Sequence, residues 1–270
     1  MSTGQQEIPA TLVKQLRDET GAGMMECKRA LVESGGDVAE AKRILRQRGL
    51  AQAGKRAERA TTEGLVGTIV GDGVGSIVGI GCESQPVSET GEFQAFGEKV
   101  LRALHADGPD ALAAFEQERL ELNAKLGENI VIVDPTRVEG QTLAAYVHPP
   151  ANKIGVLVSL DGGSEELARQ LAMHISFAAP EWTTRDDVPA ETAAAERQTF
   201  LNSDEVQSKP EAAREKIVEG MLAKRFYAAS PGGVLVDQAW IHDSAKTVGQ
   251  VLADAGATVK VFARVSVAGS

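Results

Sequence analysis

Residues 12–63 read LVKQLRDETGAGMMECKRALVESGGDVAEAKRILRQRGLAQAGKRAERATTE, and this stretch decides the fold of the N-terminal part. Apolar residues recur at helical spacing in three runs, which end at Thr20-Gly21, Gly35-Gly36 and Gly49. Asp37 can accept hydrogen bonds from the free N–H groups of the third helix. The apolar positions expected to be buried are Leu12, Val13 and Leu16, then Met24, Cys27, Ala30 and Leu31, and then Val38, Ala41, Ile44 and Leu45. A bundle of about 40 residues has little core of its own, so we predict a docking module rather than an enzyme.

The composition of the 270-residue chain excludes several classes of protein. No apolar run approaches the roughly 20 residues that span a bilayer, and MSTGQQEIPA at the N-terminus has no signal-peptide pattern. Cys27 and Cys82 form no CxxC pair, which fits a reducing cytosol. The histidines are scattered and no HExxH helix occurs, so we expect no metal and no cofactor. These features predict a cytoplasmic protein that does not bind a membrane.

The charge is unevenly distributed along the chain. There are 28 basic and 38 acidic residues, a net charge of −10, which disfavours direct nucleic-acid binding. Between Lys42 and Arg59, however, seven basic residues accompany one acid, Glu58. Two interpretations stay open: a solvated helix end with its linker, or a patch that steers an acidic partner.

The remainder of the chain predicts an α+β fold because its strands and helices do not alternate as regular βαβ units. Gly71–Gly75 is expected to be a hairpin loop and not a phosphate cradle, because no GxxxxGK[ST] pattern follows. The polar, Ala-rich residues 188–228 predict an antiparallel helical hairpin, broken near Ser208-Lys209-Pro210 and without a sustained heptad. The expected strands are Leu65–Val70, Ser76–Ile80, Ile130–Val133, Thr142–His148, Ile154–Leu160, Val234–Ile241 and Thr258–Val267. The other expected helices are Gly91–Ala106, Pro109–Leu126, Glu165–Ala178 and Ser244–Ala255.

Several of these segments, among them TGAGMMECKRAL, GLAQAGKRAERATTEGLV, EFQAFGEKV, KLGENI and LAMHISFAAPE, resemble the bacterial elongation factor Ts family. The resemblance implies a three-helix module at 1–54, similar to a ubiquitin-associated domain. Two α+β subdomains with antiparallel sheets would follow at 55–140 and 141–270, with the hairpin inserted at about 188–228. It also implies a partner of elongation factor Tu that promotes GDP release and is not an enzyme. The hairpin could contact a partner, a second copy of the chain or only solvent, and a homodimer through the C-terminal subdomain stays open.

The resemblance also points to contact residues for elongation factor Tu. Arg17, Met24 and Met25 match family positions that touch a helix of the partner's nucleotide domain, although Met24 also suits the core of the module. Leu126-Gly127 matches a contact loop, although Gly127 is also explained as a helix terminator. His148 matches a position near a more distant partner domain, and it could equally cap a strand end.

One motif departs from the family pattern. Where many members have Thr-Asp-Phe-Val, this chain has Ser84, Gln85, Pro86 and Val87. In those members the Phe wedges beside the partner's magnesium site and the Asp disturbs its surroundings. Either Pro86 is a smaller wedge and exchange survives at a reduced rate, which we favour, or the chain holds elongation factor Tu without efficient exchange.

The sequence disfavours two further classes of protein. A general adaptor that binds ubiquitin-like ligands through the module is disfavoured because the resemblance extends over residues 64–267. An enzyme is disfavoured because no nucleophile–base set, paired carboxylates or metal-ligand spacing occurs in the sequence.

Overall fold

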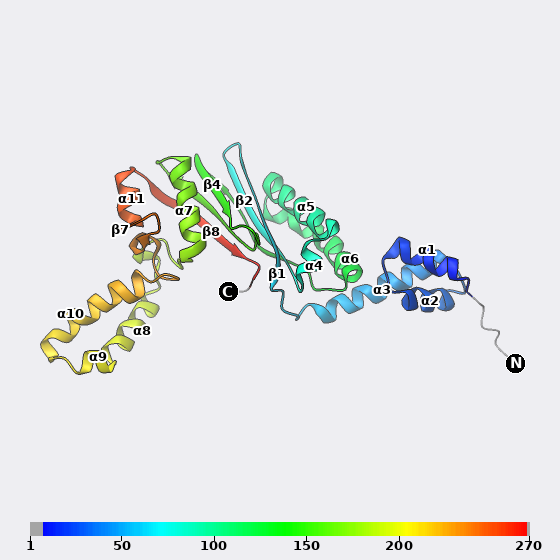
Figure 1. Ribbon diagram of the computed structural model, residues 1–270, viewed down its shortest axis with the longest axis horizontal. Coiled ribbons are helices and arrows are strands. Elements are labelled where there is room, and N and C mark those ends of the chain that lie inside the picture. The colour runs from blue at the N-terminus through cyan, green and yellow to red at the C-terminus, as the bar shows by residue number, and fades with distance from the viewer. Residues whose placement is uncertain (1–7, 269–270) are drawn as a thin grey trace. The chain divides into compact units, whose positions relative to one another are not determined.

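The computed structural model describes residues 8–268, with residues 50 and 52–55 described by their backbone only (Figure 1). The residues 1–7 of the signal-peptide prediction and the Lys55 side chain of the basic run therefore lie outside the described part. Contacts divide the chain into two compact units. The first contains the chain up to Gly67, Val78–Pro135 and the end from Ser266; the second contains Thr68–Ile77 and Thr136–Val265.

The first half of the chain carries the helical module, the first sheet and the helices packed on it. Its three strands form a sheet of order β1-β2-β3. Each of these strands contributes residues to both units. In chain order the elements are α1 (Ala10–Thr20), α2 (Met24–Glu33), α3 (Val38–Arg56), β1 (Glu63–Gly71), β2 (Val74–Cys82), α4 (Gln85–Ser88), α5 (Gly91–Asp107), a 3₁₀ helix (Pro109–Phe115), α6 (Glu116–Leu126) and β3 (Val131–Glu139).

The three-helix module forms as predicted, around its own small core. The left-handed Gly21 ends α1, and Asp37 caps α3 by accepting from the N–H groups of Ala39 at 2.8 Å and Glu40 at 3.0 Å. The buried core side chains are Val13, Leu16, Cys27, Ala30, Leu31, Ala41 and Ile44.

The prediction that the third helix ends at Gly49 is wrong, because α3 continues through Gly49 to Arg56. A β-carbon on Gly49 would lie 2.7 Å from the Cβ of Ala124 on α6, closer than side chains pack. The glycine therefore serves a close approach between α3 and α6, and it does not terminate a helix.

Helix α5 covers the first sheet with the predicted apolar stripe. Phe93, Phe96, Val100 and Leu104 are buried, and Leu101 is partly buried against the same cluster. The β1–β2 connection is a tight turn in which Asp72 and Gly73 both have positive φ (52° and 74°), as hairpins of this length require. The hairpin loop is thus confirmed.

The expected single helix Pro109–Leu126 is divided in two. Pro109–Phe115 winds as a 3₁₀ helix, and only Glu116–Leu126 is α-helical. Residues three apart lie on one side of a 3₁₀ helix, so Leu112 and Phe115 both reach the core. The Phe115 ring meets that of Phe96 edge-on, with centroids 6.4 Å apart.

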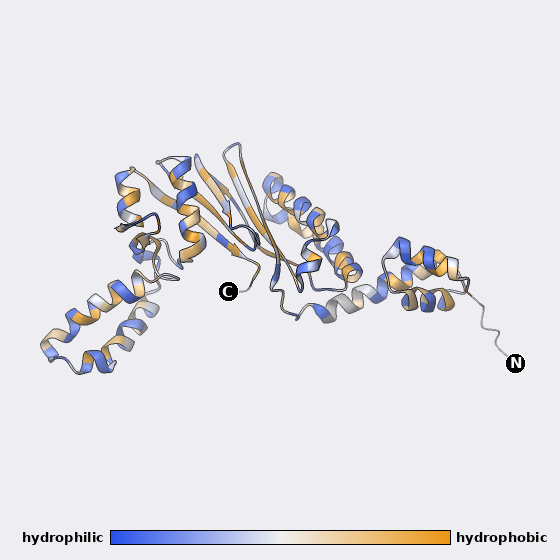
Figure 2. Cartoon of the chain, viewed as in Figure 1, coloured by the Kyte–Doolittle hydropathy of each residue, from blue (hydrophilic) through white to orange (hydrophobic). Residues whose placement is uncertain are grey.

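The second half of the chain carries the second sheet, of order β4-β5-β8, with β4 and β5 antiparallel. Hydrophobic residues follow the strands of both sheets, and the helices alternate hydrophobic with hydrophilic positions (Figure 2). In chain order the elements are β4 (Thr142–Val147), β5 (Ile154–Asp161), α7 (Glu165–Ala178), a 3₁₀ helix (Arg185–Asp187), α8 (Ala190–Leu201), α9 (Asp204–Gln207), α10 (Glu211–Met221), a π-helical turn (Leu222–Tyr227), a 3₁₀ helix (Leu235–Asp237), β6 (Ala239–Trp240), β7 (Asp243–Thr247), α11 (Val248–Asp254) and β8 (Thr258–Ser266).

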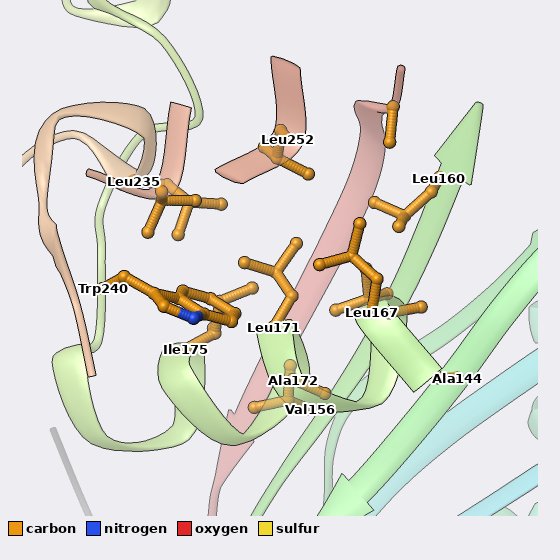
Figure 3. Close-up of a cluster of buried hydrophobic side chains, with 14 residues drawn as sticks. Ala144, Val156, Leu160, Leu167, Leu171, Ala172, Ile175, Leu235, Trp240 and Leu252 are labelled. Atoms are coloured by element: carbon orange, nitrogen blue, oxygen red, sulfur yellow. The ribbon is translucent and has the colours of Figure 1, made fainter. Parts of the chain in front are cut away.

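Helix α7 supplies the centre of the core of the second unit. Ser164 caps it as predicted, accepting from the N–H of Leu167 at 3.2 Å. Leu171 and Ile175 of α7 meet Leu235 and Trp240 in the cluster drawn in Figure 3. The predicted fold class, α+β with an N-terminal three-helix module, is confirmed.

The predicted helical hairpin is present, because α8 and α10 pack side by side and α9 lies at the turn between them (Figure 1). Its small core contains Val206, Val218, Met221 and Leu222.

Two expectations near the C-terminus are wrong. Of Val234–Ile241, only Ala239–Trp240 is a strand; Leu235–Asp237 form a 3₁₀ turn, and Val234 makes an isolated bridge with Trp182. The last helix begins at Val248 rather than near Ser244, because Thr247 and Gln250 form a reciprocal capping box.

Candidate functional site

The first candidate surface consists of Arg17, Met24 and Met25, which we call the methionine surface. All three side chains are exposed; Met24 is 44% and Met25 64% accessible. The prediction that Met24 is buried in the module is wrong. Ala22, which precedes α2, packs on the core beside Cys27 in its place, and the Cys27 thiol donates to the Ala22 carbonyl at 3.6 Å. Large exposed apolar side chains that lie together mark contact surfaces, and methionine adapts to irregular ones.

The basic run beside this surface is largely neutralised by the protein's own carboxylates. Lys42 pairs with Glu19 at 2.5 Å, and Arg59 approaches Glu83 at 3.4 Å. The remaining pairs are Arg43 with Glu40, Arg46 with Glu121 and Arg48 with Glu33. Such pairing lowers the local positive potential, which supports the interpretation of a solvated helix surface over a steering patch.

A cleft of about 910 Å³ lies within the first unit, between the module and the end of α6. The turn Gly21–Gly23 lines one part of it, and Lys125 and Gly127 line another. The turn directly before Met24 therefore lies near Gly127 of the predicted contact loop, while Arg17, Met24 and Met25 do not line the cleft.

The second candidate surface is the Ser84–Val87 segment, which leads from β2 into the short helix α4. Gln85 and Pro86 are exposed, whereas Val87 is half-buried against the cluster of Phe93 and Val78. Pro86 lies in the first turn of α4, where the missing N–H of proline is not needed. At the other end of this turn, the Ser88 hydroxyl donates to the Gln85 carbonyl at 2.7 Å. The two residues at the predicted wedge position are thus presented to solvent on an ordered backbone.

Leu126 and Gly127 end α6 next to this segment. Leu126 is partly buried against the same cluster as Val87. Gly127 is left-handed, with φ 77°, and its N–H donates to the Asn123 carbonyl at 3.0 Å. Its role as a helix terminator is therefore confirmed, and its role in partner contact stays a prediction.

Two carboxylates join these segments. Glu128 Oε2 accepts from the backbone N–H groups of Glu83 and Ser84, each at 3.1 Å, and Glu128 Oε1 accepts from the Ser84 hydroxyl. In the opposite direction, Glu83 Oε1 accepts from the N–H of Asn129 at 2.7 Å. We call this reciprocal arrangement the carboxylate clamp.

The thiol of Cys82 also supports the segment. Burial raises the pKa of this thiol to about 11, and the negative charge of Glu128 acts in the same direction. The thiol is therefore protonated at neutral pH, and it donates to the Ser84 carbonyl at 3.3 Å. Cys82 is a structural donor here and not a reactive nucleophile.

His148 lies in the second unit, at the end of β4, and its side chain is exposed. The backbone N–H of His148 donates to the Ile154 carbonyl at 2.9 Å, which continues the pairing of β4 with β5 by one residue. The ring nitrogen Nδ1 lies 3.0 Å from the Tyr146 hydroxyl, so the imidazole has a defined orientation. The backbone of His148 thus extends the end of a strand, while the ring stays available at the surface.

The structure brings the Ser84–Val87 segment and Leu126-Gly127 together. Sequence reasoning missed the two residues that join them, Glu83 and Glu128. The only available signal was that Glu128 belongs to KLGENI, one of the segments that carry the family resemblance.

The described residues contain no group of three or more histidine, cysteine or acidic side chains arranged to hold a metal ion. Within residues 8–268, no helix combines the length and apolar composition of a membrane span.

Taken together, an α+β core, a three-helix module, a helical hairpin and exposed apolar side chains on helical elements define a class of protein-binding factor. The family model described as Elongation factor TS matches residues 86–269. The chain belongs to the elongation factor Ts family and is a translation elongation factor.

Similar proteins cover almost the whole chain. Elongation factor Ts of Cronobacter sakazakii is 41% identical over 265 residues, which are 97% of this chain and 92% of that protein. That of Sodalis glossinidius is 42% identical over 267 residues, with the same two shares. That of Serratia proteamaculans is 40% identical over 265 residues, again with 97% and 92% covered. The resemblance predicted from the sequence is confirmed.

Proposed function

We propose that this translation elongation factor binds elongation factor Tu and accelerates the release of its GDP. Such a factor makes and breaks no covalent bond, so it is not an enzyme in the chemical sense. It binds the nucleotide-free partner more tightly than the GDP-bound partner, and reciprocal linkage then weakens GDP binding by the same factor.

The observation that carries this proposal is the exposure of Gln85 and Pro86 on an ordered segment beside Leu126-Gly127. Displacing groups around a bound nucleotide requires a protruding element that does not yield when it meets the partner. A fixed backbone meets this need because the cost of ordering it is already met in the free protein.

The methionine surface supplies the grip in this proposal. Exposed Met24 and Met25 offer adaptable apolar area, and Arg17 adds stacking and hydrogen bonding. His148 supplies a second point of contact on the other unit, with its ring oriented by Tyr146.

The finer proposal is that the exchange activity is reduced. An aromatic wedge buries about 150–250 Å², whereas Pro86 presents a small, rigid apolar ring. Coupling energies of about 1–3 kcal/mol already change affinity by about 5–150-fold, so a smaller wedge retains useful activity.

The second candidate function is a partner that holds elongation factor Tu without efficient exchange. The side chain of Gln85 favours it, since its amide donates to Glu89 Oε1 at 2.8 Å and is thus bonded within its own segment. An uncharged, internally bonded Gln85 neither repels a phosphate nor competes for Mg²⁺.

The experiment that separates the two functions measures release of a fluorescent GDP analogue from purified elongation factor Tu. The proposed function predicts that substoichiometric amounts of the chain accelerate release. Spontaneous release, together with complex formation in a pull-down or by light scattering, would establish the holding function instead. Light scattering also tests the homodimer, which stays a prediction together with the cytoplasmic location and the three-part division of the chain.

A further inference from the structure

The carboxylate clamp holds the end of the Ser84–Val87 segment where Gln85 and Pro86 lie. Four hydrogen bonds from residues far apart in the sequence converge there: three to the Glu128 carboxylate and one to that of Glu83. A hydrogen bond with a charged partner is stronger than a neutral one, and Glu83, Ser84 and Glu128 are each only partly exposed. The clamp is therefore a strong local constraint on the backbone at Ser84.

Helix α4 cannot hold this position alone. It has four residues, and so short a helix is unstable in isolation. Ser84 occupies its N-cap position, but the hydroxyl makes no cap bond and donates to Glu128 instead. The bonds within the segment secure its far end, through the Ser88 hydroxyl to Gln85 and the Thr90 hydroxyl to Val87. Within residues 8–268, the clamp and the Cys82 thiol supply the side-chain bonds that hold its near end.

The clamp also couples two predicted contact segments. Glu128 directly follows Gly127, and its side chain bonds the residues directly before Gln85. Asn129 is buried; its N–H donates to Glu83, and its amide donates to the carbonyls of Ala57 and Arg59. Hydrogen bonds therefore join the residues before α4, the residues after α6 and the chain after α3.

We infer that Glu128 is a positioning residue for nucleotide exchange: it fixes the Ser84–Val87 segment against Leu126-Gly127 so that Pro86 keeps its place when it meets the partner. This inference rests on the proposed exchange function. Without the Glu128 carboxylate, the Ser84–Val87 segment still binds the partner. Its backbone then adjusts to the partner's surface and does not displace the groups around GDP. Glu128 thus affects the maximal rate of GDP release more than the affinity for the partner.

The test uses the full chain with Glu128→Ala, assayed by GDP release over a range of factor concentrations. We expect the maximal rate to fall about tenfold, within the range of typical coupling energies, while the half-saturating concentration stays within about twofold. Glu128→Gln should recover most of the rate, because its carbonyl oxygen accepts from the Glu83 and Ser84 N–H groups. Glu118→Ala is the matched control, since Glu118 is a half-buried acid on α6 that pairs with Lys99 and takes no part in the clamp.

Hydrogen exchange of the Ser84 and Asn129 amides gives a second readout that does not depend on activity. We expect Glu128→Ala to lose protection at Ser84, and Glu118→Ala to retain it. If the wild-type chain does not accelerate GDP release, the proposed function fails. If Glu128→Ala retains protection of the Ser84 amide, Glu128 does not hold the segment and the positioning role fails as well. If the wild type is active, an unchanged maximal rate in Glu128→Ala, or a loss confined to affinity, overturns the positioning role.

Discussion

The methionine surface and the Ser84–Val87 segment are built in opposite ways. Met24 and Met25 are long, unbranched and exposed, and can adjust to whatever they meet. Pro86 has a rigid ring, the Gln85 amide is bonded to Glu89, and both residues lie on a backbone fixed by the carboxylate clamp. Under the proposed exchange function, this difference assigns holding the partner and displacing its ligand to separate parts of the chain. Each can therefore be weakened without the other.

The strongest test of this separation removes the adaptable surface. Met24→Ala with Met25→Ala should raise the half-saturating concentration about 30-fold, which is about 2 kcal/mol of lost contact energy. The maximal rate of GDP release should stay unchanged, because the Ser84–Val87 segment is intact. Titration of the fluorescent GDP release assay measures both quantities.

Val70→Ala is the control, because Val70 is a similarly exposed apolar residue (43%) that lies on β1 and not on the helical module. An equal loss of affinity in this variant would mean that the methionine surface is not the grip.

The next prediction enlarges the rigid element. Pro86→Phe with Gln85→Asp restores an aromatic ring and a carboxylate to the exposed positions of α4. The maximal exchange rate should rise about tenfold, since the ring adds apolar area that only the displaced state of the partner accommodates. The half-saturating concentration should change little.

Stopped-flow release of the GDP analogue at saturating factor is the measurement. Pro86→Ala serves as the control that removes the ring of proline without adding area. A double variant no faster than the wild type would show that this chain does not use the segment as its relatives' motif suggests.

A smaller effect is expected where the two contact segments meet. Gly127→Ala places a β-carbon on a residue with φ 77°, which should lower the free energy of unfolding by about 1 kcal/mol. The added methyl meets no atom within 4 Å, so the loss comes from the backbone alone. Urea denaturation measures it.

Gly91→Ala gives the contrast for this substitution. Gly91 begins α5 and its added methyl also meets no atom within 4 Å, but its φ is not left-handed. The free energy of unfolding of the Gly91→Ala variant should equal or exceed that of the wild type, because alanine favours a helix. A loss equal to that of Gly127→Ala would contradict the backbone explanation.

Local signals predicted most of the fold, and contacts between distant residues decided what was missed. Ser164 and Asp37 were recognisable caps because their bonds reach only two or three residues along the chain. The prediction that Gly49 ends a helix is wrong because the glycine is required by close packing against Ala124 on α6, which no local pattern shows.

The candidate site shows the same limit. Family-like motifs located Pro86 and Gly127, but no spacing rule joins Glu83 to Asn129 or Glu128 to Ser84, which are 46 and 44 residues apart. The exposure of Met24 likewise depends on Ala22, which packs at the edge of the core where Met24 was expected. The apolar residues Val234 and Leu235 are buried in either a strand or a turn, so hydropathy alone could not separate the two.

The last prediction concerns stability outside both surfaces and should leave exchange at neutral pH unaltered. His174 is fully buried in the second unit; its Nε2 lies 3.0 Å from Gln238 Oε1, and its Nδ1 faces the N–H of Ile241 at 3.4 Å. Burial lowers the pKa of this imidazole below its ordinary 6.5, against the opposing effect of the Gln238 bond. A lowered folded-state pKa means that the stability contribution of neutral His174 is complete above about pH 6.5 and is lost as the pH falls toward the folded-state value.

We therefore expect the melting temperature of the wild-type chain to fall between about pH 7.5 and about pH 5.5, and that of His174→Gln to fall less. Carboxylates with lowered pKa, such as Glu19, lose their contribution at more acidic pH and do not confuse this window. His148→Gln, at an exposed position, should retain the wild-type slope. If His174→Gln retained it as well, the pH dependence would belong to another group, since a buried neutral imidazole is the only feature that this substitution removes from the titration.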